Sequence, residues 1–172
     1  MSDLAIRRAE IRDIDDIQRL YRQLDRHHAE LLPEVFQPLQ GDARGDEFVQ
    51  LRIERDDAAY LLAELDGTVI GFVDVLRSTH PGYPMFRPRE FAMIDNLVVD
   101  EAHRGQGIGK SLLQAAISWA RDNGLKYVQT TVWDANARAR DLYLGQGFTP
   151  VTVRLELEVD ADPGPTTQIP GS

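Results

Sequence analysis

The segment that decides the fold follows a predicted strand and reads Val98-Val99-Asp100-Glu101-Ala102-His103-Arg104-Gly105-Gln106-Gly107-Ile108-Gly109-Lys110. The apolar run at 91–99 predicts a central strand, and the amphipathic run at 108–123 predicts a helix. Glycines allow a backbone to approach a ligand closely. Free N–H groups at a helix start attract an anion, and Arg104 and Lys110 add positive charge. The segment therefore predicts a turn that binds a pyrophosphate.

Three kinds of phosphate loop compete for this segment. The dinucleotide-binding fingerprint needs G-x-G-x-x-G, whereas the spacing here is G-x-G-x-G without a repeated parallel βαβ pattern. A P-loop ends like Gly109-Lys110-Ser111, but Arg104 occupies the position of its first glycine. The third loop type fits: the segment resembles the (Q/R)-x-x-G-x-(G/A) loop of the GNAT superfamily of acyl-CoA-dependent N-acyltransferases. For the loop taken alone, a glycine-rich turn that merely caps a helix stays an alternative.

A second segment, 136–148, resembles the other signature of that family, N-x-x-A-x-x-(F/L)-Y-x-x-x-G-F. Asn136 and Tyr143 are seven residues apart, so a helix places them on one stripe, about 10 Å from each other. The resemblance implies that Asn136 hydrogen-bonds the pantetheine arm of coenzyme A and that Tyr143 lies near the thioester sulfur. Taken alone, a helix N-cap and a core aromatic are the alternatives for these two residues.

The resemblance covers roughly residues 4–157 and implies acetyl-CoA as the cosubstrate. In this family the strand before the glycine loop separates from its neighbour at a β-bulge and offers backbone groups to the pantetheine amides. By resemblance, Leu97, Val98 and Val99 have this role. The residues implied to hold the pyrophosphate are Arg104, Gly105, Gln106, Gly107, Ile108, Gly109 and Lys110.

The chemistry implied is acetyl transfer to an amine. An alkylamine has a pKa of about 10.4, so a base must remove a proton before it attacks a thioester. Asp95 interrupts an apolar strand and is the first candidate for this base, with Glu90 second. Alternatively, Asp95 pairs with an arginine among Arg77, Arg87 and Arg89, or binds a cationic substrate. By resemblance, Tyr143 donates a proton to the leaving thiolate, and a backbone N–H near Leu97 or Val98 stabilises the oxyanion.

The remaining pattern predicts a single domain at 1–159 of mixed α/β (α+β) class. Its central sheet is mostly antiparallel, flanked by helices and splayed at the cofactor site, as in the GNAT fold. A hairpin at Asp66-Gly67 sets the antiparallel part, and a strand–helix–strand crossover sets a parallel pair. The helix at 46–55 is expected to bury Phe48 and Leu51. The strands expected are 4–8, 58–65, 68–76, 91–99, 127–132 and 151–159, the other helices are 14–32, 108–123 and 136–144, and the tail at 160–172 is expected to be disordered.

Composition narrows the function further. The chain has 172 residues, no cysteine and a formal net charge of −9, from 19 basic and 28 acidic residues. The absence of cysteine excludes a thioester-enzyme intermediate, so we expect direct transfer in a ternary complex. The charge argues against general nucleic-acid binding. Without an apolar run long enough for a membrane span or a signal peptide, we expect a cytoplasmic protein and no membrane partner.

Partners are less defined by the sequence. We expect no metal site, because the adjacent His27 and His28 point in different directions on a helix. The acceptor is a small-molecule or protein amine of unspecified identity, and the resemblance makes a homodimer an option. Two other functions stay open: a noncatalytic acyl-CoA-binding regulatory module and a P-loop-like nucleotide hydrolase.

Overall fold

The computed structural model describes residues 4–80 and 82–159. They form one sheet with the strand order β1-β2-β3-β4-β5. Every neighbouring pair is antiparallel except β4 and β5, which are parallel. This is the predicted mixed, mostly antiparallel sheet. The strands are β1 (Leu4–Arg8), β2 (Ala58–Leu65), β3 (Thr68–Thr79), β4 (Glu90–Val99) and β5 (Val128–Thr130).

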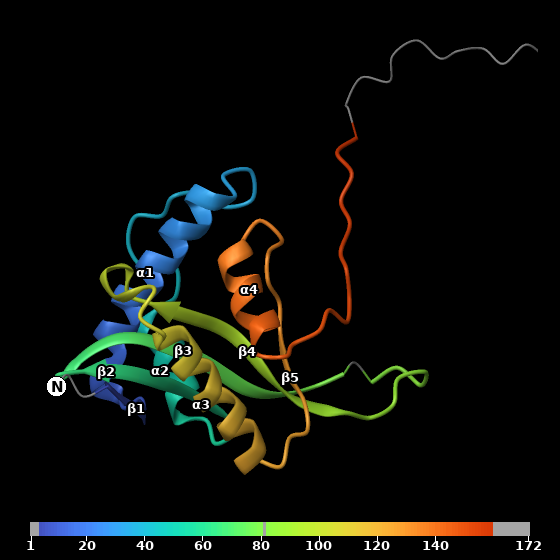
Figure 1. Ribbon diagram of the computed structural model, residues 1–172, viewed down its shortest axis with the longest axis horizontal. Coiled ribbons are helices and arrows are strands. Elements are labelled where there is room, and N and C mark those ends of the chain that lie inside the picture. Colours follow the sequence, from blue (N-terminus) through green and yellow to red (C-terminus); the bar gives the residue numbers. More distant parts are fainter. Residues whose placement is uncertain (1–3, 81, 160–172) are drawn as a thin grey trace, which may run out of the picture.

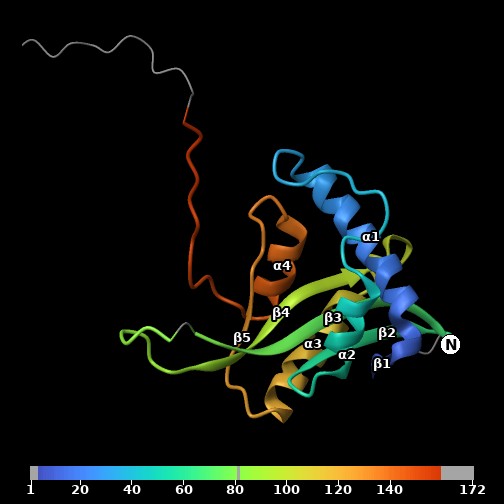
Figure 2. The same cartoon turned by 180° about the vertical axis from the view of Figure 1, so that it is seen from behind.

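Helices cover both faces of the sheet, as Figures 1 and 2 show from opposite sides. One core cluster packs α3 against the sheet and includes Val73 and Leu112, and the other packs α1 and α2 against the opposite face and includes Tyr21 and Phe72. The helices are α1 (Ile14–Leu31), α2 (Asp46–Glu54), α3 (Ile108–Asp122) and α4 (Ala137–Gly145), with short 3-10 turns η1 (Ile11–Asp13) and η2 (Glu101–His103). The described helices include none that is long and apolar enough to span a bilayer.

The hairpin between β2 and β3 confirms the turn predicted from Asp66-Gly67. Both residues have positive φ, 49° and 80° respectively. A two-residue turn with this pair of conformations matches the right-handed twist of the adjoining strands. Aspartate and glycine tolerate the left-handed region better than most residues do. The turn thereby fixes the register of β2 against β3, the strand on which β4 pairs.

The strand β4 carries a bulge at Asp95. Asn96 lies opposite Asp74 of β3 and Ile94 lies opposite Val75, so Asp95 is an extra residue without a partner on β3. On its other side β4 pairs with β5 only from Ala92 to Ile94. A bulge bends a strand and increases its local twist. The part of β4 from Asp95 to Val99 is therefore not covered by β5.

A close approach of two backbones fixes β4 next to the bulge. Gly71 of β3 lies opposite Val99, and a Cβ atom built on it would lie 2.7 Å from the Val98 carbonyl oxygen and 3.1 Å from Leu112 Cδ1. Real Cβ atoms essentially never approach a backbone oxygen this closely. A glycine is therefore required here for β4 and α3 to pack against β3 as they do.

Three predictions about the elements were wrong. The helix α2 exposes Phe48 and Leu51 and instead buries Val49 completely. The segment 151–159 forms no strand, and its five apolar side chains are 75–88% exposed. It runs away from the body of the protein in both views (Figures 1 and 2). The strand predicted at 127–132 is limited to β5, and the predicted tail at 160–172 lies outside the described residues.

Candidate active site

The glycine-rich turn leads from β4 through η2 into α3. Gly105 and Gly107 adopt φ of 82° and 83°, and Gly107 is the residue that precedes the helix. The first helical hydrogen bond runs from the Ser111 amide to the Gly107 oxygen, 3.1 Å. Within the described part of the chain, the amides of residues 105–110 have no hydrogen-bond acceptor. Unpaired amides at a helix start carry the positive end of the helix dipole and suit a phosphate.

The turn is held in place by α1. Asp100 accepts hydrogen bonds from Arg19 (2.7 Å) and Gln23 (3.1 Å), and it caps η2 through the Ala102 amide at 3.0 Å. Gln23 in turn accepts from the Glu101 amide at 3.0 Å. These contacts use the side chains of α1 to orient the residues just before the glycines. The pKa of Asp100 is lowered: burial raises it, but the hydrogen bonds that the carboxylate accepts outweigh burial.

The uncovered part of β4 lies next to this turn. Leu97 and Val99 pack into the α3 core, whereas Val98 points into the α1–α2 core. Arg104 Nε donates to the Val99 oxygen at 3.2 Å, which ties the turn to the end of the strand. A Cβ on Gly109 would lie 3.7 Å from Leu97 Cδ2, an ordinary contact, so the first turn of α3 rests directly on β4. The end of β4, the glycine-rich turn and the start of α3 thus meet at one place.

In the second motif, Asn136 directly precedes α4 and Tyr143 lies within that helix. The Asn136 side chain accepts a hydrogen bond from the Ala139 amide at 3.1 Å and so caps the helix. Tyr143 is buried, with 7% of its surface exposed, and its ring meets Phe148 edge-on at 5.3 Å. Burial raises the pKa of Tyr143, and the neighbouring Thr130 hydroxyl offsets part of that effect. Tyr143 therefore stays protonated at neutral pH and retains a proton that it can donate.

The bulge residue Asp95 has a partner that the sequence did not suggest. Its carboxylate pairs with Arg52 of α2 at 3.0 Å, not with Arg77, Arg87 or Arg89. The other guanidinium nitrogen of Arg52 pairs with Asp74 of β3 at 3.2 Å. Asp74 is 1% exposed. Burial, partly offset by Arg52, raises the pKa of Asp74 to about 7.

Glu90 lies far from this cluster. It opens β4 opposite Thr79 and pairs with Arg77 at 2.9 Å. Seven residues separate it from Leu97, or about 23 Å along a strand. That separation argues against Glu90 as the base for an amine that reacts beside Leu97. Of the two predicted candidates, Asp95 is the one that lies at the bulge.

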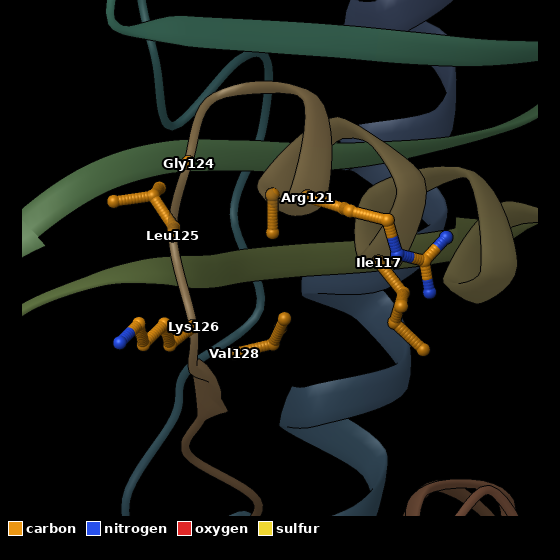
Figure 3. Close-up of a pocket in the computed structure, with 7 residues that line it drawn as sticks. Ile117, Arg121, Gly124, Leu125, Lys126 and Val128 are labelled. Carbon is orange, nitrogen blue, oxygen red and sulfur yellow. The ribbon is translucent and has the colours of Figure 1, made fainter.

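Two surface cavities lie away from these residues. One, of about 460 Å³, is formed by α3 and the connection to β5, with Arg121 and Lys126 extending in opposite directions (Figure 3). The other, of about 410 Å³, lies between α1 and the loop that follows it, near Arg26 and Pro38. Neither brings together the residues of the two sequence motifs. The candidate site is therefore defined by its backbone groups and side chains, and not by either of these cavities.

Sequence reasoning missed Asp74, Arg52 and the α1 residues that hold the turn. Asp74 lies in an apolar run, 69–76, and a lone carboxylate in a buried strand is the signal that could have identified it. Arg52 lies on a helix among other charged residues, and nothing local separates it from Arg55. Its role depends on a contact across 43 residues of sequence with Asp95.

Comparison with known proteins gives a consistent result. A family model described as the acetyltransferase (GNAT) family matches residues 18–148. An uncharacterized N-acetyltransferase from Archaeoglobus fulgidus is 29% identical over 143 residues, which cover 83% of this chain and 91% of that protein. The uncharacterized N-acetyltransferase YhfO from Bacillus subtilis is 31% identical over 108 residues, covering 62% of this chain and 70% of the relative.

Solved structures share the fold. A tetramutant of the BH1408 protein from Bacillus halodurans superposes with a TM-score of 0.83 at 23% identity, covering 90% of this chain and 99% of that one. The aminoglycoside N-acetyltransferase AAC(6')-Iy, solved in complex with CoA, gives a TM-score of 0.68 at 19% identity, covering 94% and 97%. At these identities the likeness concerns the arrangement of the elements.

Proposed function

The chain belongs to the GNAT family of acetyltransferases, and from this premise we propose that it transfers an acetyl group from acetyl-CoA to a primary amine by direct attack in a ternary complex. One observation carries the proposal. The uncovered stretch of β4 that begins at Asp95 lies beside a helix start whose amides have no hydrogen-bond acceptor among the described residues. These backbone groups match the two polar parts of coenzyme A, its pantetheine amides and its pyrophosphate.

The pyrophosphate is assigned to the turn that begins α3. The amides of residues 105–110 donate to its oxygens, and Arg104 and Lys110 supply positive charge. Positive φ at Gly105 and Gly107 turns the backbone without strain. The donor set fits an anion because amides and cations face it, while the acidic Asp100 and Glu101 are paired with Arg19 and Arg26.

The pantetheine arm is assigned to β4. An arm lying beside Leu97, Val98 and Val99 pairs with backbone groups as an added strand does. The Asp100 amide donates to the Ile70 oxygen of β3, so Val98 also faces β3, and Leu97 and Val99 face the uncovered side. The Val99 oxygen already accepts from Arg104, so Leu97 offers the more accessible groups. The Asn136 oxygen caps α4, which leaves its amide group as the donor to the arm.

When bound, acetyl-CoA supplies an activated thioester. Asp95, at the bulge, takes the proton of the attacking ammonium, directly or through a water molecule. A backbone N–H near Leu97 or Val98 donates to the carbonyl oxygen as negative charge develops on it. Tyr143 donates its proton to the departing sulfur, and the second proton that the nitrogen loses on forming the amide restores the Tyr143 hydroxyl. Tyr143 remains protonated at neutral pH because burial raises its pKa.

The acceptor is an amine of a small molecule or of a protein. The chain carries a net charge of −9, which favours approach by a cationic acceptor over an anionic one. A homodimer and a cytoplasmic location complete the proposal; both follow from the resemblance and the composition.

An amine panel tests the proposal. The purified full-length chain is mixed with acetyl-CoA and polyamines, amino acids, aminoglycosides or peptides with a free N-terminus, and release of the CoA thiol is followed together with acetylated product by mass spectrometry. We expect at least one amine to stimulate release with equimolar product. Binding of acetyl-CoA without product across the panel would favour a noncatalytic binding module, and no binding of acetyl-CoA would contradict the proposal.

A further inference from the structure

A buried carboxylate, Asp74, lies in the core face beneath α1 and α2. It is 1% exposed, and one oxygen, Oδ1, accepts from Arg52 at 3.2 Å. Within the described residues, Oδ2 accepts no hydrogen bond of normal geometry. The side-chain amide of Asn96 is nevertheless close enough to lower the pKa of Asp74. An unsatisfied buried polar group costs roughly 1–3 kcal/mol. A buried oxygen without a donor indicates either a functional role or a partner that binds at this position.

Arg52 occupies the space between this carboxylate and the one at the bulge. Its side chain is 11% exposed, while that of Asp95 is 37% exposed, so the guanidinium lies between a deep carboxylate and a surface one. A cation at this position interacts with both carboxylates at once. A guanidinium is not the only cation that can do so, because an ammonium group also offers several donors.

The guanidinium fits this position less well than other arginines of the chain fit theirs. Arg55 grips Asp57 with two hydrogen bonds of 2.7 and 2.8 Å, and Arg7 grips Asp13 with two of 2.8 Å. Arg52 instead makes one bond to each of two carboxylates, at 3.2 and 3.0 Å. Paired, parallel bonds are the strong arrangement for arginine. Arg52 thus holds neither carboxylate in this strong arrangement, which leaves both open to a competing cation.

The cluster also lies where the acceptor of the proposed reaction must arrive. Asp95 is two residues from Leu97, about 7 Å along a strand. Asn96 contacts Tyr21 of α1 at 3.4 Å and Asp95 contacts Arg52 of α2, so both bulge residues face the α1–α2 side. Leu97 and the glycine turn belong to the α3 side. An acceptor can therefore approach from the face opposite to the pyrophosphate turn.

We propose that Asp74 and Asp95 form the binding site for the cationic nitrogen of the acceptor, a primary alkylammonium, and that Arg52 occupies this site until the acceptor displaces it. The inference rests on the proposed acetyltransferase function and names the residues that select its acceptor. Displacement of Arg52 leaves two carboxylates for a single positive charge. A neutral amine analogue or alcohol lacks the charge that this site recognises.

The site responds to pH through Asp74. Burial raises the pKa of Asp74 to about 7, and Asp95 adds to the rise while Arg52 opposes it. The groups that face Asp74 from the surrounding elements are Tyr21 of α1, Arg44 of the following loop, Arg52 of α2, Arg55 at the end of α2, Tyr60 of β2, and Asp95 and Asn96 of β4. Because Asp74 gains its negative charge as the pH rises through about 7, affinity for the ammonium rises between about pH 6 and pH 8.5. An alkylammonium stays charged over this range.

Titration with 1,4-diaminobutane tests the site without relying on turnover. The full-length chain is titrated at pH 8.5, with and without CoA, while the amide signals of Asp95 and Asn96 are followed by NMR. We expect Arg52→Met to bind the diamine roughly fivefold more tightly than the wild type, because a partly exposed competing ion pair is removed. Arg52→Lys keeps the competing charge and is expected to stay within about twofold of the wild type.

A matched control removes an arginine from an ion pair elsewhere on the surface. Arg12→Met breaks the exposed pair with Glu10 and is expected to leave diamine affinity unchanged. Asp95→Asn is expected to weaken binding at least about fivefold. A folded Arg52→Met protein that binds the diamine no more tightly than the wild type overturns the inference. If that variant does not fold, unchanged affinity in Asp95→Asn overturns it.

Failure of this inference and failure of the acetyltransferase function are distinguishable. A chain that binds the diamine at Asp95 but acetylates no amine contradicts only the function. A chain that acetylates amines with the same KM in the wild type, Arg52→Met and Asp95→Asn contradicts only the proposed acceptor site. Loss of kcat at constant KM in Asp95→Asn likewise contradicts the acceptor site, because it assigns Asp95 to the chemical step alone.

Discussion

The Thr130 hydroxyl of β5 donates a hydrogen bond to the Ile94 backbone oxygen of β4, over 3.1 Å, at the last pair of residues where these two parallel strands are in register. Beyond this pair β4 bulges at Asp95 and continues to Val99 without β5 beside it. The bond therefore marks the position where β5 stops pairing with β4 and where the backbone groups on that side of β4 become available to a ligand.

Replacement of Gly71 by alanine is expected to disturb the uncovered part of β4. The new methyl group would meet the Val98 oxygen at 2.7 Å, and relief of this contact must move β4 or α3. We expect the free energy of unfolding to fall by roughly 1–3 kcal/mol and the Kd for acetyl-CoA to rise. Urea unfolding and calorimetric titration measure the two effects. Gly45→Ala, which meets nothing within 4 Å, is the control; equal effects in both variants would contradict the account.

Gly107→Ala is expected to weaken acetyl-CoA binding beyond its effect on stability. A residue with a side chain at φ 83° costs about 1–2 kcal/mol, and relaxation of that strain reorients the amides that start α3. Loss of one or two charge-assisted hydrogen bonds corresponds to at least about a tenfold rise in Kd. Gly124→Ala carries comparable strain at φ 72° and lies at the other end of α3. We expect the Kd of Gly124→Ala for acetyl-CoA to match that of the wild type. Similar Kd values for Gly107→Ala and Gly124→Ala would argue against the assignment of the pyrophosphate to the turn that begins α3.

Tyr143→Phe tests the assigned proton donor. We expect kcat to fall roughly a hundredfold, the lower range for loss of a general acid, while the Kd for acetyl-CoA stays within about twofold of the wild type. The ring contact with Phe148 does not involve the hydroxyl group and is preserved. Tyr127→Phe is a control, because that tyrosine is 47% exposed and stacks under Arg89. Unchanged turnover in Tyr143→Phe would remove Tyr143 from the mechanism.

The buried Asp74 makes stability depend on pH. Its pKa of about 7 in the folded state exceeds the value of about 3.9 for an unfolded aspartate. Between these values the folded state binds more protons, so the free energy of unfolding decreases as pH rises. Asp74→Asn removes this dependence and is expected to gain roughly 2–4 kcal/mol relative to the wild type between pH 5 and pH 8.

Urea unfolding at the two pH values measures this difference. Asp57→Asn is the control because the pKa of Asp57 is lowered, chiefly by its hydrogen bond with Arg55, so its ionisation does not change between pH 5 and pH 8. A stability difference between Asp74→Asn and the wild type that is the same at both pH values would contradict the raised pKa of Asp74.

The elements with strong local signals were predictable. The Asp66-Gly67 turn, the helix after the glycines and the apolar strand before them each depend on a short stretch of chain, and the structure has all three. The helix α2 was oriented wrongly because Phe48, Val49, Leu51 and Ile53 offer two apolar stripes, and only packing against β2 selects Val49. Alternation in 151–159 predicted a strand, but a strand also requires a partner for its backbone groups.

The parts of the site that the sequence could not reveal depend on distant contacts. Asp95 and Asp74 meet through Arg52, and residues on α1 hold the glycine turn through Asp100. No local pattern encodes these pairings, because they arise from the order in which the strands and helices pack. By contrast, the glycines and Tyr143 belong to contiguous motifs and could be assigned roles before the fold was known.

The response of backbone amides to coenzyme A tests the central claim most directly. A nitrogen–proton correlation spectrum of the full-length chain is recorded while CoA is added. We predict that the amides of residues 105–110 and of Leu97 and Val99 shift in proportion to bound ligand, while that of Gly67 in the distant hairpin does not. Binding of CoA that leaves the amides of 105–110 unshifted would contradict the account.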